Sequence, residues 1–242
     1  MAALTQDEQK QLAAKTAVDA LMKEGLIFSG MKIGMGTGST ALPAVKRISE
    51  LLADGTIKNI KAVATSYQTE NACAAWGIPI YAFHDLKIDG HLDLAIDGAD
   101  EIDDSNNLIK GGGAALLREK IIEYNSERVV IVADSSKTVK TFGTKFPLPV
   151  EIIPEAYTAV KRELKKLGAT VTLREGLRKC GPVITDNGNQ IVDCLWKEPV
   201  DPVEFENMIN QITGVVENGF FTKANPSVFI AKEDGSVEIR NF

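Results

Sequence analysis

The sequence is poor in the residues that cross-link a fold or bind transition metals. Its 242 residues include three cysteines and two histidines. Cys73, Cys180 and Cys194 are odd in number and show no CxxC spacing, which argues against a disulfide framework and against a zinc site. His84 and His91 stand in strand-flanking segments, where an ordinary histidine is more common than a metal ligand. We therefore predict no metal and no other cofactor.

The sequence also lacks an excess of positive charge and any long apolar run. It carries 27 basic and 33 acidic side chains, a formal net charge of −6, which disfavours a broad electrostatic surface for nucleic acid. Residues 1–15 are polar, without the apolar core of a signal peptide, and no later stretch approaches the ~20 apolar residues that span a bilayer. We expect a cytoplasmic protein that binds neither nucleic acid nor a membrane.

Against this ordinary composition, two glycine-rich segments stand out. In the first, a short apolar run is followed by Gly36-Thr37-Gly38-Ser39-Thr40 and then by a helical pattern from Pro43 to Leu52. A strand, a Gly/Ser/Thr turn and a helix can place phosphate oxygens against backbone N–H groups and hydroxyls. The spacing fits neither a Walker loop nor G-x-G-x-x-G, so it indicates the phosphate of a small metabolite rather than a nucleotide. The alternative is a tight turn without a ligand.

The second segment, Lys110-Gly111-Gly112-Gly113, precedes a run of strong helix formers. The glycines let a ligand approach the backbone, and the first N–H groups of the helix would face that ligand. Lys110 lies at the start of the loop. Glu119 is expected about two turns into the helix, where its carboxylate could reach the far end of a small anionic substrate. Its neighbours Arg118 and Lys120 are expected to be solvent-facing or structural, and a mobile linker with surface charges is the alternative for the whole segment.

Five carboxylates lie within Asp97–Asp104, directly after the apolar run Leu92–Ile96. They could bind a divalent metal, since such ions prefer oxygen ligands. Alternatively, Asp97 and Asp100 could hydrogen-bond sugar hydroxyls and transfer protons. A solvated loop is the third interpretation, and it suits Asp103 and Asp104 best. No histidine supports a metal, so we favour the sugar; the role of residues 103–107 stays open.

Apolar runs and helical patterns alternate along the first part of the chain. Strands are predicted at residues 31–35, 60–65, 78–83, 92–96 and 129–133. This alternation favours an α/β fold, a Rossmann-like and mostly parallel sheet with helices on both faces. Ligands of such sheets bind at the carboxyl ends of the strands, which is where the motifs above fall.

The pattern changes after residue 147. Strands, helices and a hairpin joining residues 183–185 to 191–196 follow in the order β-α-β-β-α-β, that of a ferredoxin-like α+β unit. We predict a catalytic domain formed by residues 1–147 and 223–242, and a smaller ferredoxin-like domain at 148–222 that acts as a lid or an oligomer contact.

Five ordered motifs resemble type A ribose-5-phosphate isomerase. They are Gly36–Thr40, Asp97–Glu101, Lys110–Lys120, Ala133–Lys137 and Lys145–Glu151. The resemblance covers nearly the whole chain. It implies an aldose-ketose isomerase of the pentose phosphate pathway that interconverts D-ribose 5-phosphate and D-ribulose 5-phosphate without a metal. It also implies a Rossmann-like catalytic domain, a smaller ferredoxin-like domain, and a homodimer or homotetramer.

The resemblance also suggests roles for individual residues. Glu119 would be the general base that moves a proton between C2 and C1 through a cis-enediol, and Asp97 would open the sugar ring. Lys110, the third catalytic candidate, could stabilise charge on the enediolate oxygen. Lys15, on the first helix, could help to hold the phosphate or could be a surface charge. The substrate-binding residues would be Thr37, Gly38, Ser39, Thr40, Asp97, Gly98, Ala99, Asp100, Lys110, Gly111, Gly112, Gly113 and Lys137.

A sugar-phosphate sensor without turnover is the main alternative function. A sensor would not need Glu119, and it would normally be joined to a DNA-binding segment, which this acidic chain lacks. An amino-sugar-phosphate deaminase or a coenzyme A transferase on a similar sheet is a third possibility.

Overall fold

The computed structural model describes residues 3–242, which form two compact units. The first unit comprises the described residues up to Ala99 together with Ile121–Lys137 and Ala224–Phe242. The second comprises Asp100–Lys120 and Thr138–Lys223. The predicted boundary at 222/223 lies next to the junction after Lys223, whereas the one at 147/148 lies after the junction at 137/138. Residues 138–147 and Asp100–Lys120, predicted in the first domain, therefore fall in the second unit. The candidate site residues are therefore divided between the units.

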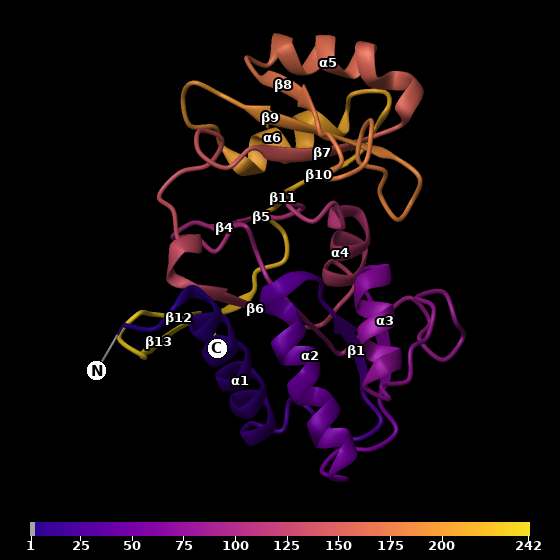
Figure 1. Cartoon of the computed structure of the whole chain (residues 1–242), viewed down its shortest axis with the longest axis vertical. Coiled ribbons are helices and arrows are strands. Elements are labelled where there is room, and N and C mark those ends of the chain that lie inside the picture. Colours follow the sequence, from indigo (N-terminus) through magenta and orange to yellow (C-terminus); the bar gives the residue numbers. More distant parts are fainter. Residues whose placement is uncertain (1–2) are drawn as a thin grey trace. The chain divides into compact units, whose positions relative to one another are not determined.

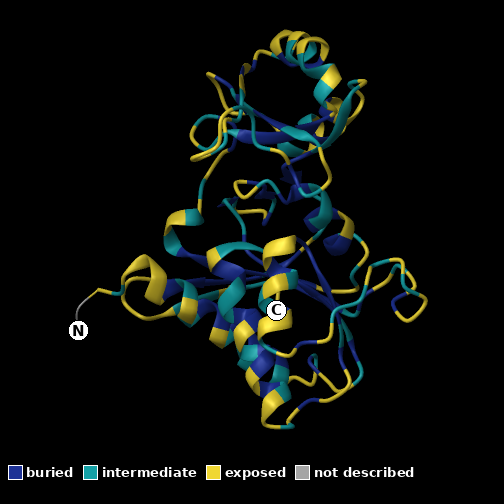
Figure 2. Cartoon of the chain, turned by 45° about the vertical axis from the view of Figure 1, so that its right-hand side comes forward, coloured by how far each residue is buried: buried dark blue, intermediate teal, exposed yellow. Residues whose placement is uncertain are grey.

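A six-stranded sheet forms the centre of the first unit, in the order β13-β12-β6-β3-β1-β2 (Figure 1). Neighbouring strands pair in parallel except β12 and β13. The central strand β6 is buried along its whole length, as parallel strands covered on both faces usually are (Figure 2). The strands are β1 Lys32–Met35, β2 Lys61–Ala64, β3 Leu94–Asp97, β6 Val129–Asp134, β12 Ser227–Ala231 and β13 Val237–Arg240.

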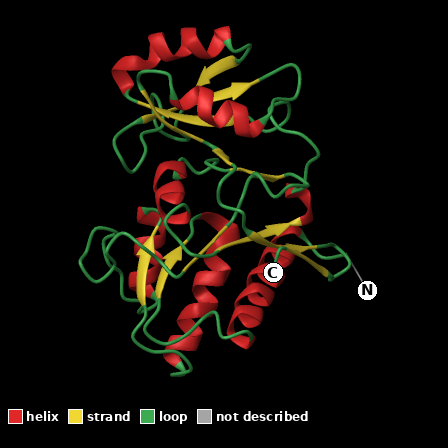
Figure 3. Cartoon of the chain, turned by 180° about the vertical axis from the view of Figure 1, so that it is seen from behind, coloured by secondary structure: helices red, strands yellow, loops and turns green. Residues whose placement is uncertain are grey.

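Three helices pack on one face of this sheet: α1 Gln6–Lys23, α2 Gly38–Ala53 and α3 Tyr67–Ala75 (Figure 3). Alternate strand residues face them, including Ile33, Met35 and Leu94, because side chains alternate across a strand. The opposite face carries a smaller apolar cluster in which Ile88, Leu92 and Ile122 cover Val63 and Ala95. The mostly parallel α/β sheet predicted from the alternating pattern is confirmed.

The second unit contains a four-stranded antiparallel sheet in the order β10-β7-β9-β8. Its elements follow as β7 Leu148–Ile152, α5 Tyr157–Lys166, β8 Thr170–Leu173, β9 Gln190–Leu195, α6 Pro202–Asn210 and β10 Val215–Asn218. This is the predicted β-α-β-β-α-β order. The core of the unit includes Val150, Val160, Leu164 and Ile209 from its strands and helices.

A second, three-stranded sheet in this unit has no counterpart in the sequence analysis. It joins β4 Glu101–Ile102, β5 Leu108–Ile109 and β11 Phe220–Phe221 in the order β11-β5-β4. Strands of two residues are too short to give a periodic pattern. Between β4 and β5, Asp103 accepts hydrogen bonds from the backbone N–H groups of Ser105 and Asn107. The acidic segment whose role was open is thus in part a turn stabilised by Asp103.

Two predicted strands are wrong. At 78–83, Ile80 alone bridges to Ala62, and Pro79, which has no N–H to donate, interrupts the ladder. At 183–185, Ile184 alone bridges to Gln190. Both edges of β9 are already paired, with β7 on one side and β8 on the other, so no edge remains for a third partner.

In the part of the chain that the structure describes, no helix is both long enough and apolar enough to cross a bilayer.

Candidate active site

The first glycine-rich segment is the start of a helix. Thr37 is the N-cap of α2, and Gly38–Thr40 form its first turn, whereas the helix was predicted to begin at Pro43. Proline is common at the first position of a helix, but Pro43 lies inside α2, where it cannot donate to the carbonyl four residues back. Gly38 adopts φ +87°, and its N–H donates to Gln68 Oε1 at 3.0 Å. The segment therefore presents the amide end of a helix, the feature that binds anions.

Asp97 holds the turn before this helix. The residue is 1% exposed at the end of β3, and its Oδ1 accepts the N–H of Thr37 at 3.0 Å and of Gly98 at 2.7 Å. A Cβ at Gly36 would lie 2.2 Å from that oxygen and 2.6 Å from the Asp97 Cα. Glycine is therefore required at position 36 by the carboxylate of Asp97.

A cluster of hydroxyl groups in the first unit was missed by the sequence analysis. Thr37 Oγ1 lies 2.6 Å from Thr65 Oγ1, 2.7 Å from Ser66 Oγ and 3.2 Å from Thr69 Oγ1. Thr69 Oγ1 donates in turn to the carbonyl of Gly36. Thr65 and Ser66 directly follow β2, so the rule that ligand groups gather at strand ends could have identified them.

The remaining candidates of this unit differ in exposure. Thr40 is buried against Gly98: a Cβ added at Gly98 would lie 3.2 Å from the Thr40 Cβ. Ser39, by contrast, is exposed. Lys137 is half-buried in the short 3-10 helix η1 Ser135–Lys137, directly after β6. Lys15 is exposed on α1 and lines, with Ser39, a groove of about 750 Å³. A phosphate contact by Lys15 stays open.

In the second unit, Lys110 and Glu119 form a buried pair. They are 1% and 6% exposed, and Lys110 Nζ lies 3.8 Å from Glu119 Oε2. Glu119 lies in the first turn of helix α4 Leu116–Glu123 rather than about two turns in. The helix begins late because Ala114, at φ +60°, donates back to the carbonyl of Gly111 and closes a turn before it.

The glycine loop itself is held by charged side chains. Gly112 N–H donates to Asp100 Oδ2 at 2.7 Å, so this amide already has a partner. Arg174 Nη1 donates to the carbonyls of Gly111 and Gly112 at 2.8 and 3.1 Å and is itself paired with Asp193. Arg174 was not among the predicted site residues, because no local pattern links it to a loop some sixty residues earlier in the chain.

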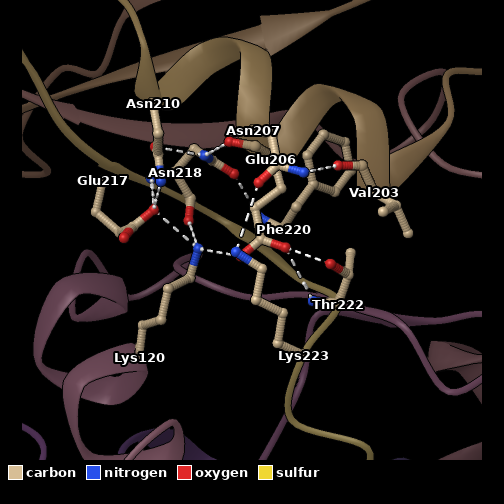
Figure 4. Close-up of polar contacts among 10 residues, drawn as sticks. All are labelled: Lys120, Val203, Glu206, Asn207, Asn210, Glu217, Asn218, Phe220, Thr222 and Lys223. Atoms are coloured by element: carbon tan, nitrogen blue, oxygen red, sulfur yellow. Dashed lines mark hydrogen bonds and ion pairs between the residues drawn. The ribbon is translucent and has the colours of Figure 1, made fainter.

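Arg118 and Lys120, which flank Glu119, both contact other elements. Arg118 donates to Asn187 Oδ1 and to the carbonyl of Asp186. Lys120 is buried and bonds to Glu206 and Glu217 (Figure 4). Arg118 and Lys120 were expected to be either solvent-facing or structural, and these contacts support the structural role. The prediction that Lys120 faces solvent is wrong, because the residue is buried.

The acidic segment is divided between the two units and between environments. Asp97 and Glu101 are buried, Asp100 is half-buried and Asp104 is exposed. Across residues 3–242, no group of three or more His, Cys, Asp or Glu side chains is placed so that it could hold a metal ion. Asp97 Oδ1 and Asp100 Oδ2 each accept backbone N–H groups within their own units.

This chain is similar in sequence and in fold to known proteins. The sequence model of the family described as "Ribose 5-phosphate isomerase A (phosphoriboisomerase A)" matches residues 61–235. The ribose-5-phosphate isomerase A of Treponema denticola is 57% identical over 231 residues, which cover 95% of this chain and 97% of the relative. That of Treponema pallidum is 51% identical, over 96% of this chain and 92% of the relative. A D-ribose-5-phosphate isomerase solved in complex with phospho-erythronic acid superimposes with a TM-score of 0.91 at 40% identity, covering 98% of this chain and 99% of that one.

Proposed function

The chain belongs to the ribose 5-phosphate isomerase A family, and on that premise we propose that it interconverts D-ribose 5-phosphate and D-ribulose 5-phosphate by metal-independent proton transfer with Glu119 as the base. The family resemblance drawn from the five motifs is confirmed by these matches. The substrate is the one named for the relatives, and the roles of individual residues are our proposal.

The observation that carries the mechanism is the pair formed by Lys110 and Glu119. A proton next to a carbonyl is weakly acidic, so its removal needs a positioned base and a partner for the negative charge that appears on oxygen. A carboxylate and an ammonium group 3.8 Å apart, both buried, supply these two functions within one unit. Burial strengthens both effects, because little water remains to screen them.

The reaction balances with these groups alone. In the open-chain aldose, the Glu119 carboxylate takes the proton from C2 and becomes a carboxylic acid, while the C2–H electrons form the C1–C2 double bond and the electrons of the C1 carbonyl move onto O1. Lys110 stabilises the negative charge on this cis-enediolate oxygen. The proton of the C2 hydroxyl passes to the neighbouring O1, and Glu119 returns its proton to C1, so that the carbonyl forms at C2 and the product is the ketose. One group acts as acid and base in turn, so no second base is needed for this step.

The candidate groups of the first unit suit phosphate binding and ring opening. The amides of Ser39 and Thr40, in the first turn of α2, and the hydroxyl of Thr37 suit a phosphate. We assign ring opening to Asp97, whose carboxylate is oriented by the N–H groups of Thr37 and Gly98. Lys137, after β6, would add positive charge.

A sensor that binds the same sugar phosphate without turnover is the second candidate. A sensor would give the buried Lys110–Glu119 pair no function, because binding alone does not require a base beside an ammonium group. Burying a charged pair is costly unless the geometry is well matched. The pair therefore favours the enzyme.

The decisive experiment measures ketose formation from D-ribose 5-phosphate in the presence of EDTA. The intact protein and Glu119→Gln are compared, since glutamine keeps the shape of the side chain and removes the base. We expect rapid turnover by the intact protein and a loss of at least ~10³-fold in the variant, the order that a general base contributes. Binding of phospho-erythronic acid, measured by calorimetry, should persist in Glu119→Gln and would show that its site is intact.

Failure of the folded intact protein to turn over ribose 5-phosphate, with binding retained, would move the assignment to the sensor. Activity lost with EDTA and restored by a divalent metal would contradict the metal-free mechanism. The homodimer or homotetramer remains a prediction, which light scattering of the purified protein would check.

A further inference from the structure

Lys120 is a buried cation that takes no part in the chemistry proposed above. It is 4% exposed, and its ammonium group donates to Glu206 Oε1 at 3.2 Å, Glu217 Oε1 at 2.9 Å and the carbonyl of Asn218 at 2.8 Å (Figure 4). An ammonium group has three N–H donors. Three acceptors from α6 and β10 therefore fix its position completely.

The acceptors of Lys120 are themselves held in place. Glu206 is buried, and its other oxygen accepts the N–H and the hydroxyl of Thr222. Glu217 Oε1 also accepts from Asn210 Nδ2 at 2.7 Å. A buried charge cluster of this kind adds little net stability, because desolvation offsets the attraction between the charges. Its clearest effect is geometric, since it ties one point of α4 to a rigid partner.

One segment of chain, Asn218–Phe221, contacts both Lys120 and Lys110. The carbonyl of Asn218 accepts from Lys120, and the carbonyl of the next residue, Gly219, accepts the backbone N–H of Lys110 at 2.9 Å. The ring centroid of Phe221 lies 4.8 Å from Lys120 Nζ and 5.5 Å from Lys110 Nζ. The two ammonium groups thus share one aromatic ring, to which both are attracted.

This arrangement links the two members of the candidate catalytic pair. Glu119 is adjacent to Lys120 on α4, so the anchor on Lys120 also limits rotation and sliding of Glu119. Lys110 is attached to the same segment through its backbone and through Phe221. We propose that Lys120 is a positioning residue which, by anchoring α4 to residues 218–221, sets the separation between the Glu119 carboxylate and the Lys110 ammonium. This inference rests on the proposed function of that pair.

Charge compensation is the second part of the role. Two ammonium groups over one ring would repel each other, and that repulsion would push Lys110 away from its place beside Glu119. Glu206 and Glu217 offset the charge of Lys120 locally. Lys110 can then respond to charge on Glu119 and on the substrate.

The test compares three variants of the full-length protein. Lys120→Met keeps the apolar stem and removes the charge, Lys120→Arg keeps a cation, and Val171→Ala opens a small cavity in the core of the same unit, in β8, outside α4 and residues 218–221. We expect Lys120→Met to lower kcat by ~10²-fold, the effect of misplacing a reacting group by about 1 Å. KM should change less than ~3-fold, because Lys120 does not touch the substrate. Lys120→Arg should recover at least ~10-fold of the lost kcat, and Val171→Ala should keep kcat within ~2-fold.

Glu217→Gln replaces Lys120→Met in the test if Lys120→Met does not fold. It weakens the anchor without leaving a buried carboxylate unpaired, and kcat should fall by ~3- to 10-fold.

Crystal structures of the variants give a readout that does not depend on turnover. The distance from Lys110 Nζ to Glu119 Oε2 should lengthen in Lys120→Met and stay near its original value in Lys120→Arg and Val171→Ala.

An unchanged distance, or kcat for Lys120→Met within ~2-fold of the intact protein, would overturn the positioning role. So would a loss of kcat in Val171→Ala as large as that in Lys120→Met, because it would indicate general destabilisation. An intact protein without isomerase activity would refute the proposed function instead, while the distance would still decide whether Lys120 positions the pair.

Discussion

The two glycine-rich loops of this protein are held by different kinds of group. In the first unit, the turn at Gly36-Thr37 is held by one carboxylate, Asp97, and by the neutral hydroxyls that surround Thr37. In the second unit, the loop after Lys110 is held by Asp100 and Arg174 and lies beside a buried lysine-glutamate pair. Amides and hydroxyls suit an anion whose charge stays constant, and buried charges suit a step in which charge moves. The difference supports the proposal that the first loop binds the substrate and that the second carries out the proton transfer between carbon atoms.

The largest expected effect tests the second loop. Lys110→Met removes the ammonium beside Glu119 but keeps an apolar side chain of similar length, and it should lower kcat by ~10³-fold, as loss of one charge-stabilising donor does. KM should change much less. Steady-state kinetics with ribose 5-phosphate would measure both constants, and a raised KM with unchanged kcat would contradict the division of roles. Circular dichroism should confirm that the variant is folded.

The glycines of the two loops differ in the space around them, which predicts different effects on stability. Gly36→Ala places a methyl group 2.2 Å from Asp97 Oδ1 and should lower the free energy of unfolding by ~3 kcal/mol, as overpacking does. Gly113→Ala is the matched control, because a Cβ there meets nothing within 4 Å and the residue does not have a positive φ. Its effect on unfolding should stay within ~0.5 kcal/mol. Urea denaturation would measure both, and equal losses would contradict the argument from packing.

A smaller effect is expected for the hydroxyl of Thr37. Thr37→Val removes the oxygen that bonds to Thr65 and Ser66 and should raise KM for ribose 5-phosphate by ~10-fold, the value of about one hydrogen bond, with kcat within ~3-fold. The exposed Thr56, in the same unit, provides a control in Thr56→Val, which should change neither constant. A loss of kcat equal to that of Lys110→Met would show that the first loop also takes part in the chemistry.

The smallest effect concerns the cysteines, which report on opening of each unit separately. Burial raises the pKa of the Cys73 thiol to about 11 and also raises the pKa of Cys194, so both should be neutral thiols at pH 8 and react slowly with a disulfide reagent. Cys180 is exposed, and one thiol of the native protein should react fast. In Gly36→Ala, modification should speed up at Cys73 in the first unit and remain slow at Cys194 in the second. Faster modification of both would show that the units open together.

Much of the first unit was predictable because its signals are local. Strands β1, β2, β3 and β6 agree with the predicted strands within a few residues, since each carries its own apolar pattern. The strand predicted at 78–83 failed because Pro79 has no N–H to donate to a ladder with β2, and the pattern of apolar residues does not report on hydrogen-bond donors. The start of α2 was misplaced because Pro43 imitates a helix start.

The residues of the candidate site also fall into those that the local sequence predicts and those that it does not. Gly36–Thr40, Asp97 and the loop after Lys110 could be found from sequence, because turns and strand ends have recognisable compositions. The partners that hold them could not. Arg174, Glu206 and Glu217 reach the loop and α4 from distant parts of the chain, and nothing in their own neighbourhood marks them.

The amino-acid sequence alone thus determined the family, the alternation of strands and helices, and the residue types available for binding and proton transfer. Those properties depend on local composition and spacing, which a chain carries whether or not it is folded. The tertiary structure decided that Lys110 and Glu119 lie 3.8 Å apart and that Lys120 is buried. These are distances and environments created by the packing of remote segments, and they set the electrostatics on which the proposed chemistry depends.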